Sequence, residues 1–334
     1  MTNDTSGCVS HKLVYKAFLF TLPFWIIIAI YLHDDPFMVL KKYRTYDSDV
    51  VLNEEHVGWF IYKNNRDSIR FNSFILGNSC TMAFLCHDWE KHLDNGDRAV
   101  RLFGNAESLK AILLKLQALE REDAEIKNVL IILDKSSLSK INLQSGFNHI
   151  LPAEISGKSY FSTQSEFLQA FIMPDFLFPY LKYRITGRVS SDMKFMNPYG
   201  RVRNFMNNDA INPRDWMIKQ EGESYWTSRK EEFPERDKQL VVAERAIYQP
   251  QLALLKEIAD LLYRHNTLLR IIISPDYNQK KLNPSDTEML NKVFGHECVF
   301  DFSGINKYTE DYHFYYEQGH YRPVLGNLLL DSIY

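Results

Sequence analysis

The strongest constraint on this chain is an uncharged apolar run near its N-terminus. Residues 17–32 read AFLFTLPFWIIIAIYL. Including Leu13 to Lys16 extends the run to about 20 residues, because the lysine side chain can carry its amine to the interface. A helix of that length crosses the hydrocarbon core of a bilayer, and it tolerates a proline such as Pro23. We predict a transmembrane anchor over residues 13–33, preceded by a tail over residues 1–12.

The flanks of this run predict its fate and its orientation. Residues 33–36 (HDDP) contain no small-x-small cleavage site, which favours an uncleaved anchor over a signal peptide. Lys12 and Lys16 precede the run and two aspartates follow it, although the basic residues of 41–44 (KKYR) reduce the difference. The charges predict a cytoplasmic tail and an extracytoplasmic remainder from about residue 34 onward.

Composition limits what the remainder of the chain does. Apolar residues make up 45% and charged residues 24% of the 334 residues, which predicts a packed core and excludes global disorder. With 39 basic and 42 acidic residues, the net charge of -3 gives no electrostatic basis for nucleic-acid binding. The four cysteines match no zinc or redox spacing, so we predict no metal and no cofactor.

A strand–helix alternation begins after a polar stem over residues 34–70, in which 58–62 is a possible short strand. The pattern predicts strands at 71–76, 99–103, 128–133, 268–273 and 298–302, and helices from 78 to about 93 and at 106–120, 251–264, 286–294 and 322–333. The run NVLIIL at 128–133 is apolar enough to be buried on both faces. The alternation predicts an α/β fold of three layers around a parallel sheet.

Residues 135–249 interrupt this alternation and are predicted to form an insertion or lid. Helical pieces are expected near 163–185 and 228–247, the second carrying a charged, solvated face. Two interpretations of the aromatic and basic side chains in the insertion stay open, a sugar-binding wall and a hydrophobic mini-core. These side chains are Tyr199, Arg201, Arg203, Trp216, Tyr225 and Trp226.

Ser79 is the first candidate for chemistry. It belongs to a Gly77-Asn78-Ser79 sequence that follows the first strand and begins a helix. Backbone amides at such a helix start can stabilise the oxyanion formed when the serine oxygen attacks a carbonyl. A serine in this place can also serve only as a helix cap. The neighbouring Cys80 is a weaker candidate, because its side chain points elsewhere.

The second candidate is the sequence Glu317-Gln318-Gly319-His320 near the C-terminus. A carboxylate three residues before a histidine can reach Nδ1 of the imidazole, which leaves Nε2 free to accept a proton from a serine. His313 is a competing base without that spacing. Gly104 and Asn105, after the second strand, can supply an amide and a side-chain donor to an oxyanion hole, or can simply form a βα turn.

The order of these motifs resembles that of the SGNH (GDSL-like) hydrolases. The resemblance covers roughly residues 71–134 and 250–334, and it implies a flavodoxin-like three-layer α/β/α domain over 71–334. It implies that Ser79 is the nucleophile, His320 the general base and Glu317 its orienting carboxylate. It further implies an oxyanion hole formed by the Ser79 amide, Gly104 and an asparagine side chain, for which Asn105 is the candidate.

The sequence departs from the SGNH pattern at three places. Asn78 stands where the family commonly has aspartate, and Glu317 replaces the aspartate of the family's Asp-x-x-His pair. The expected Gly-x-Asn-Asp block after 128–133 is absent, because the sequence there reads Leu133-Asp134-Lys135-Ser136. The asparagine of the oxyanion hole must therefore come from Asn105 or from the insertion.

The resemblance is closest to membrane-anchored bacterial members that act on cell-envelope or exported polysaccharides. It implies a serine esterase or O-acyltransferase that moves an acetyl group, with a polysaccharide or acyl ester as substrate and envelope biosynthesis proteins as possible partners. The alternative is an inactive relative that binds a glycan or an assembly partner. A nucleotide-binding transferase is a third possibility, against which stands the lack of a Gly-rich phosphate loop.

Overall fold

The computed structural model describes residues 6–190, 193–196, 202–236 and 238–334, with the backbone alone over 6–12. Its centre is a parallel sheet of five strands in the order β2-β1-β3-β6-β7. The strands are β1 (Ser73–Gly77), β2 (Ala99–Arg101), β3 (Asn128–Leu133), β6 (Leu268–Ile273) and β7 (Val299–Asp301). The five predicted strands are confirmed within a few residues, and so is the α/β class with a parallel sheet.

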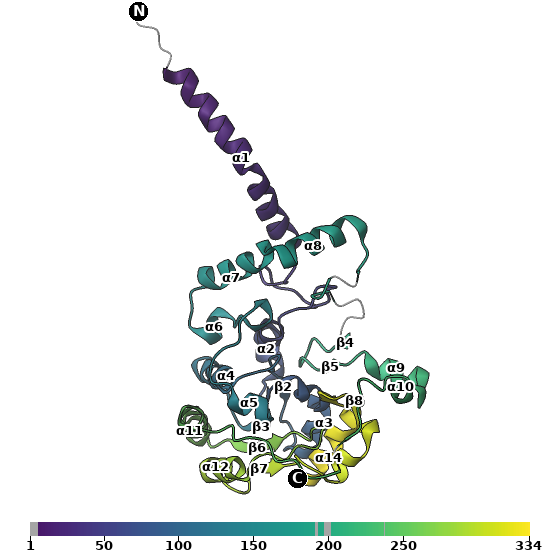
Figure 1. The fold of residues 1–334 in the computed structure, drawn as a ribbon. Helices are drawn as coiled ribbons and strands as arrows, with labels where there is room; N and C mark the ends of the chain where they lie inside the picture. Colours follow the sequence, from purple (N-terminus) through teal and green to yellow (C-terminus); the bar gives the residue numbers. More distant parts are fainter. Residues whose placement is uncertain (1–5, 191–192, 197–201, 237) are drawn as a thin grey trace, which may run out of the picture.

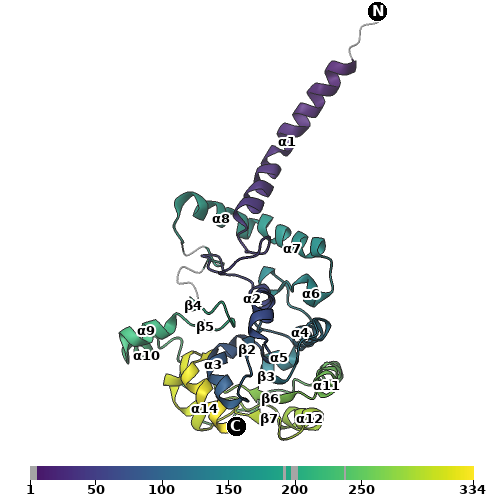
Figure 2. The ribbon, with the colours of Figure 1, turned by 180° about the vertical axis from the view of Figure 1, so that it is seen from behind.

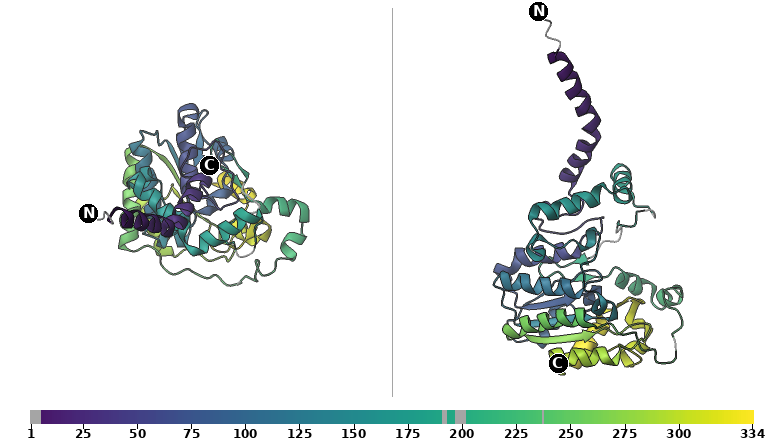
Figure 3. Two further views of the ribbon diagram at one scale, coloured as in Figure 1. Left: turned by 90° about the horizontal axis from the view of Figure 1, so that it is seen from above. Right: turned by 60° about the vertical axis from the view of Figure 1, so that its left-hand side comes forward.

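Helices cover both faces of this sheet, consistent with three layers. Helices α4 (Leu109–Arg121), α11 (Gln249–Arg264) and α12 (Pro284–Phe294) share one hydrophobic core with the strands. Short α3 (Cys86–Trp89) and α14 (Pro323–Ile333) pack into a second core on the other face. Strand β3 contributes Val129 and Ile131 to the first core and Leu130 and Ile132 to the second, because successive side chains of a strand point to opposite faces. Figure 3 shows these elements stacked below the long N-terminal helix.

The connection from β1 to its two neighbours creates a crevice. The chain leaves β1 for β2 on one side and later returns to β3 on the other, and ligands in such sheets bind where the order reverses. Gly77 ends β1 with φ +126°, and a Cβ there would lie 2.2 Å from the carbonyl oxygen of Ile132. Only glycine therefore allows the turn after β1 to pass so close to β3.

The possible strand at 58–62 is wrong, because these residues lie in helix α2 (Glu54–Ile69). The Asn53 side chain caps this helix by accepting hydrogen bonds from the amides of Glu55 and His56 at 2.9 and 3.2 Å. Trp59 and Tyr62 are three residues apart, so both reach the core on one helix face. Part of the predicted stem therefore packs against the α/β core.

Two predicted helices are also wrong. After β1 the chain forms a 3-10 turn η1 (Ser79–Ala83), then α3 of four residues and η2 (Glu90–His92), because Phe84 and Leu85 adopt extended backbone and break the helix. Within the described part of 228–247 there is no helix. The backbone there pairs instead with Lys281, whose amide donates to Val241 and whose carbonyl accepts from Ala243, both at 2.8 Å.

The insertion is built from short helices and one hairpin. The helices are α5 (Lys135–Ser139), α6 (Ala153–Ser156), α7 (Tyr160–Ile172), α8 (Pro174–Thr186), α9 (Arg214–Glu221) and α10 (Ser224–Thr227), and the hairpin joins β4 (Val202–Arg203) to β5 (Ala210–Ile211). Helices α7 and α8 confirm the helical prediction near 163–185. Tyr225 and Trp226 are buried with Ile218 and Tyr316, which supports the mini-core interpretation for these two aromatics. Tyr199 and Arg201 lie outside the described residues.

The N-terminal helix α1 (Ser6–Asp34) projects away from the rest of the molecule (Figures 1 and 2). Its portion Leu13–Asp34, 22 residues, is long and apolar enough to cross a membrane, and none of its most apolar window is buried within the protein. The helix predicted over 13–33 is therefore present. Residues 1–5 of the predicted tail lie outside the described residues, and the domain boundaries at 33 and 70 stay predictions.

Candidate active site

Ser79 meets Glu317 and His320, a pair far from it in the sequence, at the carboxyl end of the sheet. The Ser79 hydroxyl oxygen lies 2.7 Å from Nε2 of His320. On the opposite side of the ring, Nδ1 of His320 hydrogen bonds to Oε1 of Glu317. A hydroxyl, an imidazole and a carboxylate in this sequence of contacts have the geometry of a serine–histidine–acid triad.

A small hairpin positions the histidine and its carboxylate. Glu317 ends β8 (Tyr315–Glu317) and pairs across the antiparallel ladder with His320, which begins β9 (His320–Tyr321). The Gly319 amide donates a hydrogen bond of 2.6 Å to Oε2 of Glu317, so both carboxylate oxygens are held. The glutamate side chain therefore reaches the imidazole with both of its oxygens fixed.

A close helix contact brings this hairpin to the serine. Helix α14 begins directly after the hairpin and packs on η1, the turn that carries Ser79. At Gly326 of α14, a Cβ would lie only 1.9 Å from the backbone oxygen of Ala83, so a larger residue would push the two elements apart. Glycine at position 326 thus sets the separation on which the Ser79–His320 contact depends.

Electrostatics keep the Glu317 carboxylate ionised. Burial by itself raises the pKa of this group, but the hydrogen bond and charge of His320 and the Gly319 amide outweigh it, so the pKa of Glu317 lies below its ordinary value. The side chains of Glu317 and His320 are 24% and 32% exposed. The negatively charged Glu317 carboxylate can therefore stabilise an imidazolium at His320.

The predicted role of Gly104 as an oxyanion donor finds no support in this conformation. The Gly104 amide donates to the carbonyl of Gly77 at 3.2 Å and to Oε2 of Glu107 at 3.1 Å. The same Glu107 oxygen accepts from the Gly77 amide at 3.1 Å. Glu107 thus clamps the turns after β1 and β2 together and occupies the N–H that the resemblance assigned to catalysis.

Ser79 and His320 open into a cavity of about 400 Å³. Three regions line it: the carboxyl edge of the sheet, the segment that leads into α2, and the insertion. These residues are Tyr46, Asp47, Ser48, Val50, Val51, Leu52, Glu54, Ser79, Met82, Asn105, Met196, Arg203, Asn212, Pro213 and His320. Residues 46–54, the segment that leads into α2, could not be predicted as part of the site because no sequence motif marks them.

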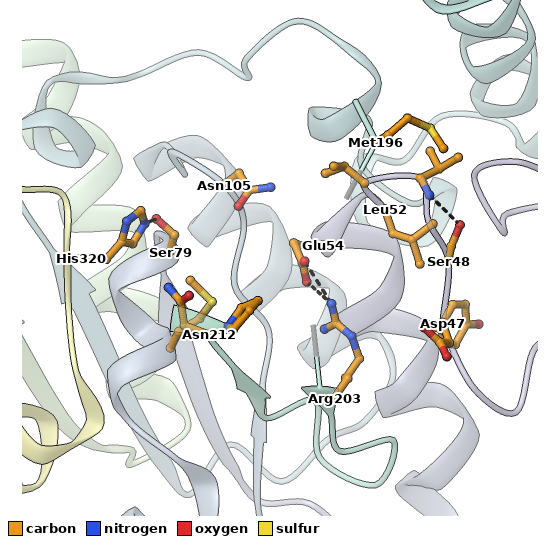
Figure 4. Close-up of a pocket in the computed structure, with 15 residues that line it drawn as sticks. Asp47, Ser48, Leu52, Glu54, Ser79, Asn105, Met196, Arg203, Asn212 and His320 are labelled. Atoms are coloured by element: carbon orange, nitrogen blue, oxygen red, sulfur yellow. Dashed lines mark hydrogen bonds and ion pairs between the residues drawn. The ribbon is translucent and has the colours of Figure 1, made fainter. Parts of the chain in front are cut away.

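Two asparagines in this cavity are candidates for the missing oxyanion side chain. Asn105 follows β2 as predicted, and Asn212 comes from the insertion. Oδ1 of Asn212 accepts a hydrogen bond of 3.0 Å from the Arg214 amide, which directs its amide nitrogen away from that contact. Figure 4 shows both side chains in the cavity with Ser79 and His320. A contribution from the insertion was expected from the sequence, but no motif singled out Asn212.

Arg203 forms a buried ion pair at the wall of the cavity. Its guanidinium donates to both carboxylate oxygens of Glu54 at 3.0 and 2.7 Å, and the two side chains are 4% and 3% exposed (Figure 4). The pair links the β4–β5 hairpin of the insertion to the start of α2. Arg203 therefore holds the wall of the cavity together, and its charge is already balanced.

Asn78, where the resemblance led us to expect an aspartate, hydrogen bonds to Asp134. The Asn78 amide nitrogen donates to Oδ2 of Asp134 at 2.8 Å and to the Ser137 hydroxyl at 3.0 Å, while its oxygen accepts from the Cys80 amide at 2.9 Å. An aspartate at position 78 would place two carboxylates face to face. The side-chain amide at 78 donates a hydrogen bond to the carboxylate at 134 without adding a second negative charge, and this bond joins the ends of β1 and β3.

The two weaker candidates are engaged elsewhere. Burial raises the pKa of the Cys80 thiol well above its ordinary value, which disfavours the thiolate that a nucleophile needs. His313 contacts Asp311 through Nδ1 at 2.6 Å and Glu223 through Nε2 at 2.8 Å. Both of its nitrogens are therefore held by carboxylates, away from Ser79.

Neither a scan against protein-family models nor a search of the curated proteins finds a match for this chain.

Proposed function

We propose that this chain is a membrane-anchored serine esterase or O-acetyltransferase of the SGNH kind. The observation that carries the proposal is the contact of 2.7 Å between the Ser79 hydroxyl and Nε2 of His320, with Glu317 on the other ring nitrogen. In strand order along the chain, the sheet reads 2-1-3-4-5, which is the order of flavodoxin-like folds and agrees with the resemblance.

The proposed reaction has two halves that share an acyl-enzyme. His320 Nε2 accepts the Ser79 proton while the serine oxygen bonds to the ester carbonyl carbon, and the proton then passes to the departing alkoxide. In the second half, His320 deprotonates water or a sugar hydroxyl, whose oxygen attacks the acyl-serine. The ester bond to Ser79 breaks and the serine recovers its proton. Glu317 stabilises the imidazolium in both halves.

The oxyanion of each tetrahedral intermediate needs donors. The Ser79 amide begins η1, where the first amides have no partner within the helix. We expect the asparagine side chain that completes the hole to be Asn105 or Asn212. Replacing that asparagine by alanine should lower kcat by about 10²- to 10³-fold with little change in KM, because a donor to the oxyanion acts in the transition state.

Steady-state kinetics of Asn105→Ala and Asn212→Ala on an acetyl ester distinguish these two donors. Asp47→Asn, in the same cavity on the side of the α2 segment, is the matched control and should leave kcat within a few-fold of the parent. Full activity in both asparagine variants and in their combination would contradict a side-chain donor at either position.

The proposed substrate is an acetylated or acetylatable polysaccharide outside the cytoplasm. The cavity carries hydroxyl and amide groups from Ser48, Asn105 and Asn212. Such groups hydrogen bond to sugar hydroxyls. The lysines before the apolar run of residues 17–32 and the aspartates after it favour an extracytoplasmic domain. Envelope biosynthesis proteins are the partners proposed for such an enzyme.

A second candidate function, binding of a glycan or an assembly partner without catalysis, is favoured by the hydrogen bond of the Gly104 amide to Glu107. Since Glu107 occupies that N–H and no Gly-x-Asn-Asp block follows 128–133, two of the oxyanion donors that the resemblance implies are missing. A chain with such a site can hold a glycan or an assembly partner without turning over an ester.

Labelling by a fluorophosphonate separates the two functions. We expect stoichiometric phosphonylation of the full-length protein at Ser79, since the probe needs a serine activated by a base. Ser48→Ala should label like the parent protein, because Ser48 lines the same cavity but its hydroxyl accepts a hydrogen bond from the Val50 amide. Ser79→Ala should not label. An unlabelled parent protein that still binds glycan would contradict the enzyme and support the binding protein.

A further inference from the structure

Helices α7 and α8 form a layer at the base of α1. Figure 1 shows them lying across the end of α1, with the sheet and the remaining helices on their other side. Asp34, the last residue of α1, accepts a hydrogen bond of 2.6 Å from Nε of Arg184 and one of 3.0 Å from the Tyr180 hydroxyl. Tyr31 is 2% exposed and packs against Phe171 of α7. Helix α1 is therefore docked on this layer at its last turn.

The length of α1 leaves no gap between a bilayer and this layer. The 22 residues of Leu13–Asp34 span about 33 Å at the helical rise per residue, and the hydrocarbon core is about 30 Å thick. The whole of the segment Leu13–Asp34 is thus needed to cross the hydrocarbon core of the bilayer. Ile27 and Ile30, within that segment, already pack against the core formed by α7 and α8. The layer must therefore lie at the height of the lipid headgroups.

The solvent-facing side of the layer has the composition of a membrane interface. Its exposed apolar side chains include Phe161 at 83%, Phe178 at 66% and Ile185 at 84% exposure. Phe178 and Ile185 lie seven residues apart on α8, and so on one helix face. Residues 158–188 hold four basic and two acidic side chains, but Lys158 pairs with Glu166 and Arg184 with Asp34, so the exposed apolar side chains are what suit a membrane interface.

We propose that α7 and α8 are an interfacial membrane-docking surface, so that the domain rests on the bilayer rather than standing off on a stem. This inference depends on the membrane anchor of the proposed function. Its consequence concerns the active-site cavity, which shares Val50 and Met196 with the core beneath α7 and α8. These two residues form an antiparallel bridge between the segment leading to α2 and the insertion. The cavity is thereby held directly below the membrane-facing layer, within reach of substrates at the bilayer surface.

Spin labels on the full-length protein in phosphatidylcholine nanodiscs containing phosphatidylglycerol test the proposal. Single labels are placed by Phe178→Cys and Ile185→Cys, with Cys8→Ser and Cys298→Ser in the background; Cys80 and Cys86 are buried. Phe20→Cys, at an 88% exposed position of α1, is the reference for hydrocarbon, and Trp216→Cys, at a 62% exposed position of α9, is the reference for water. Collision rates with oxygen and with a water-soluble nickel complex report depth.

We expect the labels at 178 and 185 to favour oxygen over nickel, as for side chains about 5–10 Å into the headgroup and acyl boundary. Labels at 178 and 185 that match 216 while the label at 20 reports hydrocarbon would overturn the docking surface and leave the anchor intact. A label at 20 that also matches 216 would overturn the anchor itself. Dipolar broadening between labels at 178 would show that a second copy of the chain, rather than lipid, covers the surface.

Discussion

Replacing Ser79 by alanine is expected to lower kcat for p-nitrophenyl acetate by about 10⁴- to 10⁶-fold, the cost of removing a member of a serine triad. The hydroxyl that would attack the ester lies 2.7 Å from the base that would deprotonate it. Without the oxygen no acyl-enzyme forms, and only the donors around the carbonyl continue to favour attack by water. The measurement is steady-state turnover by the purified full-length protein in detergent.

The combination of variants shows whether Ser79 and His320 act as a unit. His320→Ala should cost about as much as Ser79→Ala, and the double variant should be no slower than either, because residues of one proton relay are not additive. Cys80→Ala is the matched control at the neighbouring position and should retain activity within a few-fold. Turnover by Ser79→Ala at the parent rate would exclude Ser79 as the nucleophile.

Replacing Lys115 by methionine is expected to lower the free energy of unfolding by about 3–5 kcal/mol, the cost of breaking a buried ion pair from one side. Lys115 is buried and contacts Glu107, lies 2.5 Å from Oε2 of Glu55, and donates 2.9 Å to the Leu102 carbonyl. Its loss leaves two buried carboxyl groups without a cation, directly behind the turns that carry the active site. Urea unfolding followed by the fluorescence of the buried Trp59 and Trp89 measures the change.

Lys110→Met on the same helix is the matched control for Lys115→Met. Lys110 is only partly buried, so its replacement should change the free energy of unfolding by no more than about 0.5 kcal/mol. Equal stability of the two variants would contradict the assignment of Lys115 as the cation of the cluster.

The same cluster predicts how stability depends on pH. Two carboxyl groups face one lysine, and burial raises the pKa of Glu107 to about 8 and also raises the pKa of Glu55. Between the ordinary carboxyl pKa and pH 8 the folded state therefore binds a proton that the unfolded state releases, so stability falls as the pH rises through this window. Glu55→Gln leaves one carboxyl for one lysine and should flatten that fall.

The elements of the α/β domain could be predicted because burial imposes local patterns. The run NVLIIL matches β3 (Asn128–Leu133) residue for residue, since a central parallel strand is apolar on both faces. The pattern failed where tertiary contacts override it. Helix α2 appeared as a polar stem because its buried face includes Glu54, Glu55 and His56. The expected helix at 228–247 is absent from its described residues because that backbone pairs with Lys281.

The candidate triad could be read from motif spacing, whereas its surroundings could not. A carboxylate three residues before a histidine brings the two within reach in one hairpin, so Glu317 and His320 were predictable from the sequence. Asn212 has no such marker, because it reaches the cavity only through the way the insertion folds back over the sheet. The same holds for residues 46–54, which line the cavity from the other side.

The amino-acid sequence by itself determined which segments become the five strands of the central sheet, which run forms the apolar N-terminal helix, and which serine, histidine and glutamate are candidates for chemistry. These properties depend on burial and spacing along one segment. Only the tertiary structure decided that the Gly104 amide donates to Glu107, that the Asn78 side chain donates to Asp134, and that the insertion closes the cavity beneath α7 and α8. Each of these is a contact between residues distant in the chain or a competition for one donor, and such contacts are fixed only when the whole domain packs.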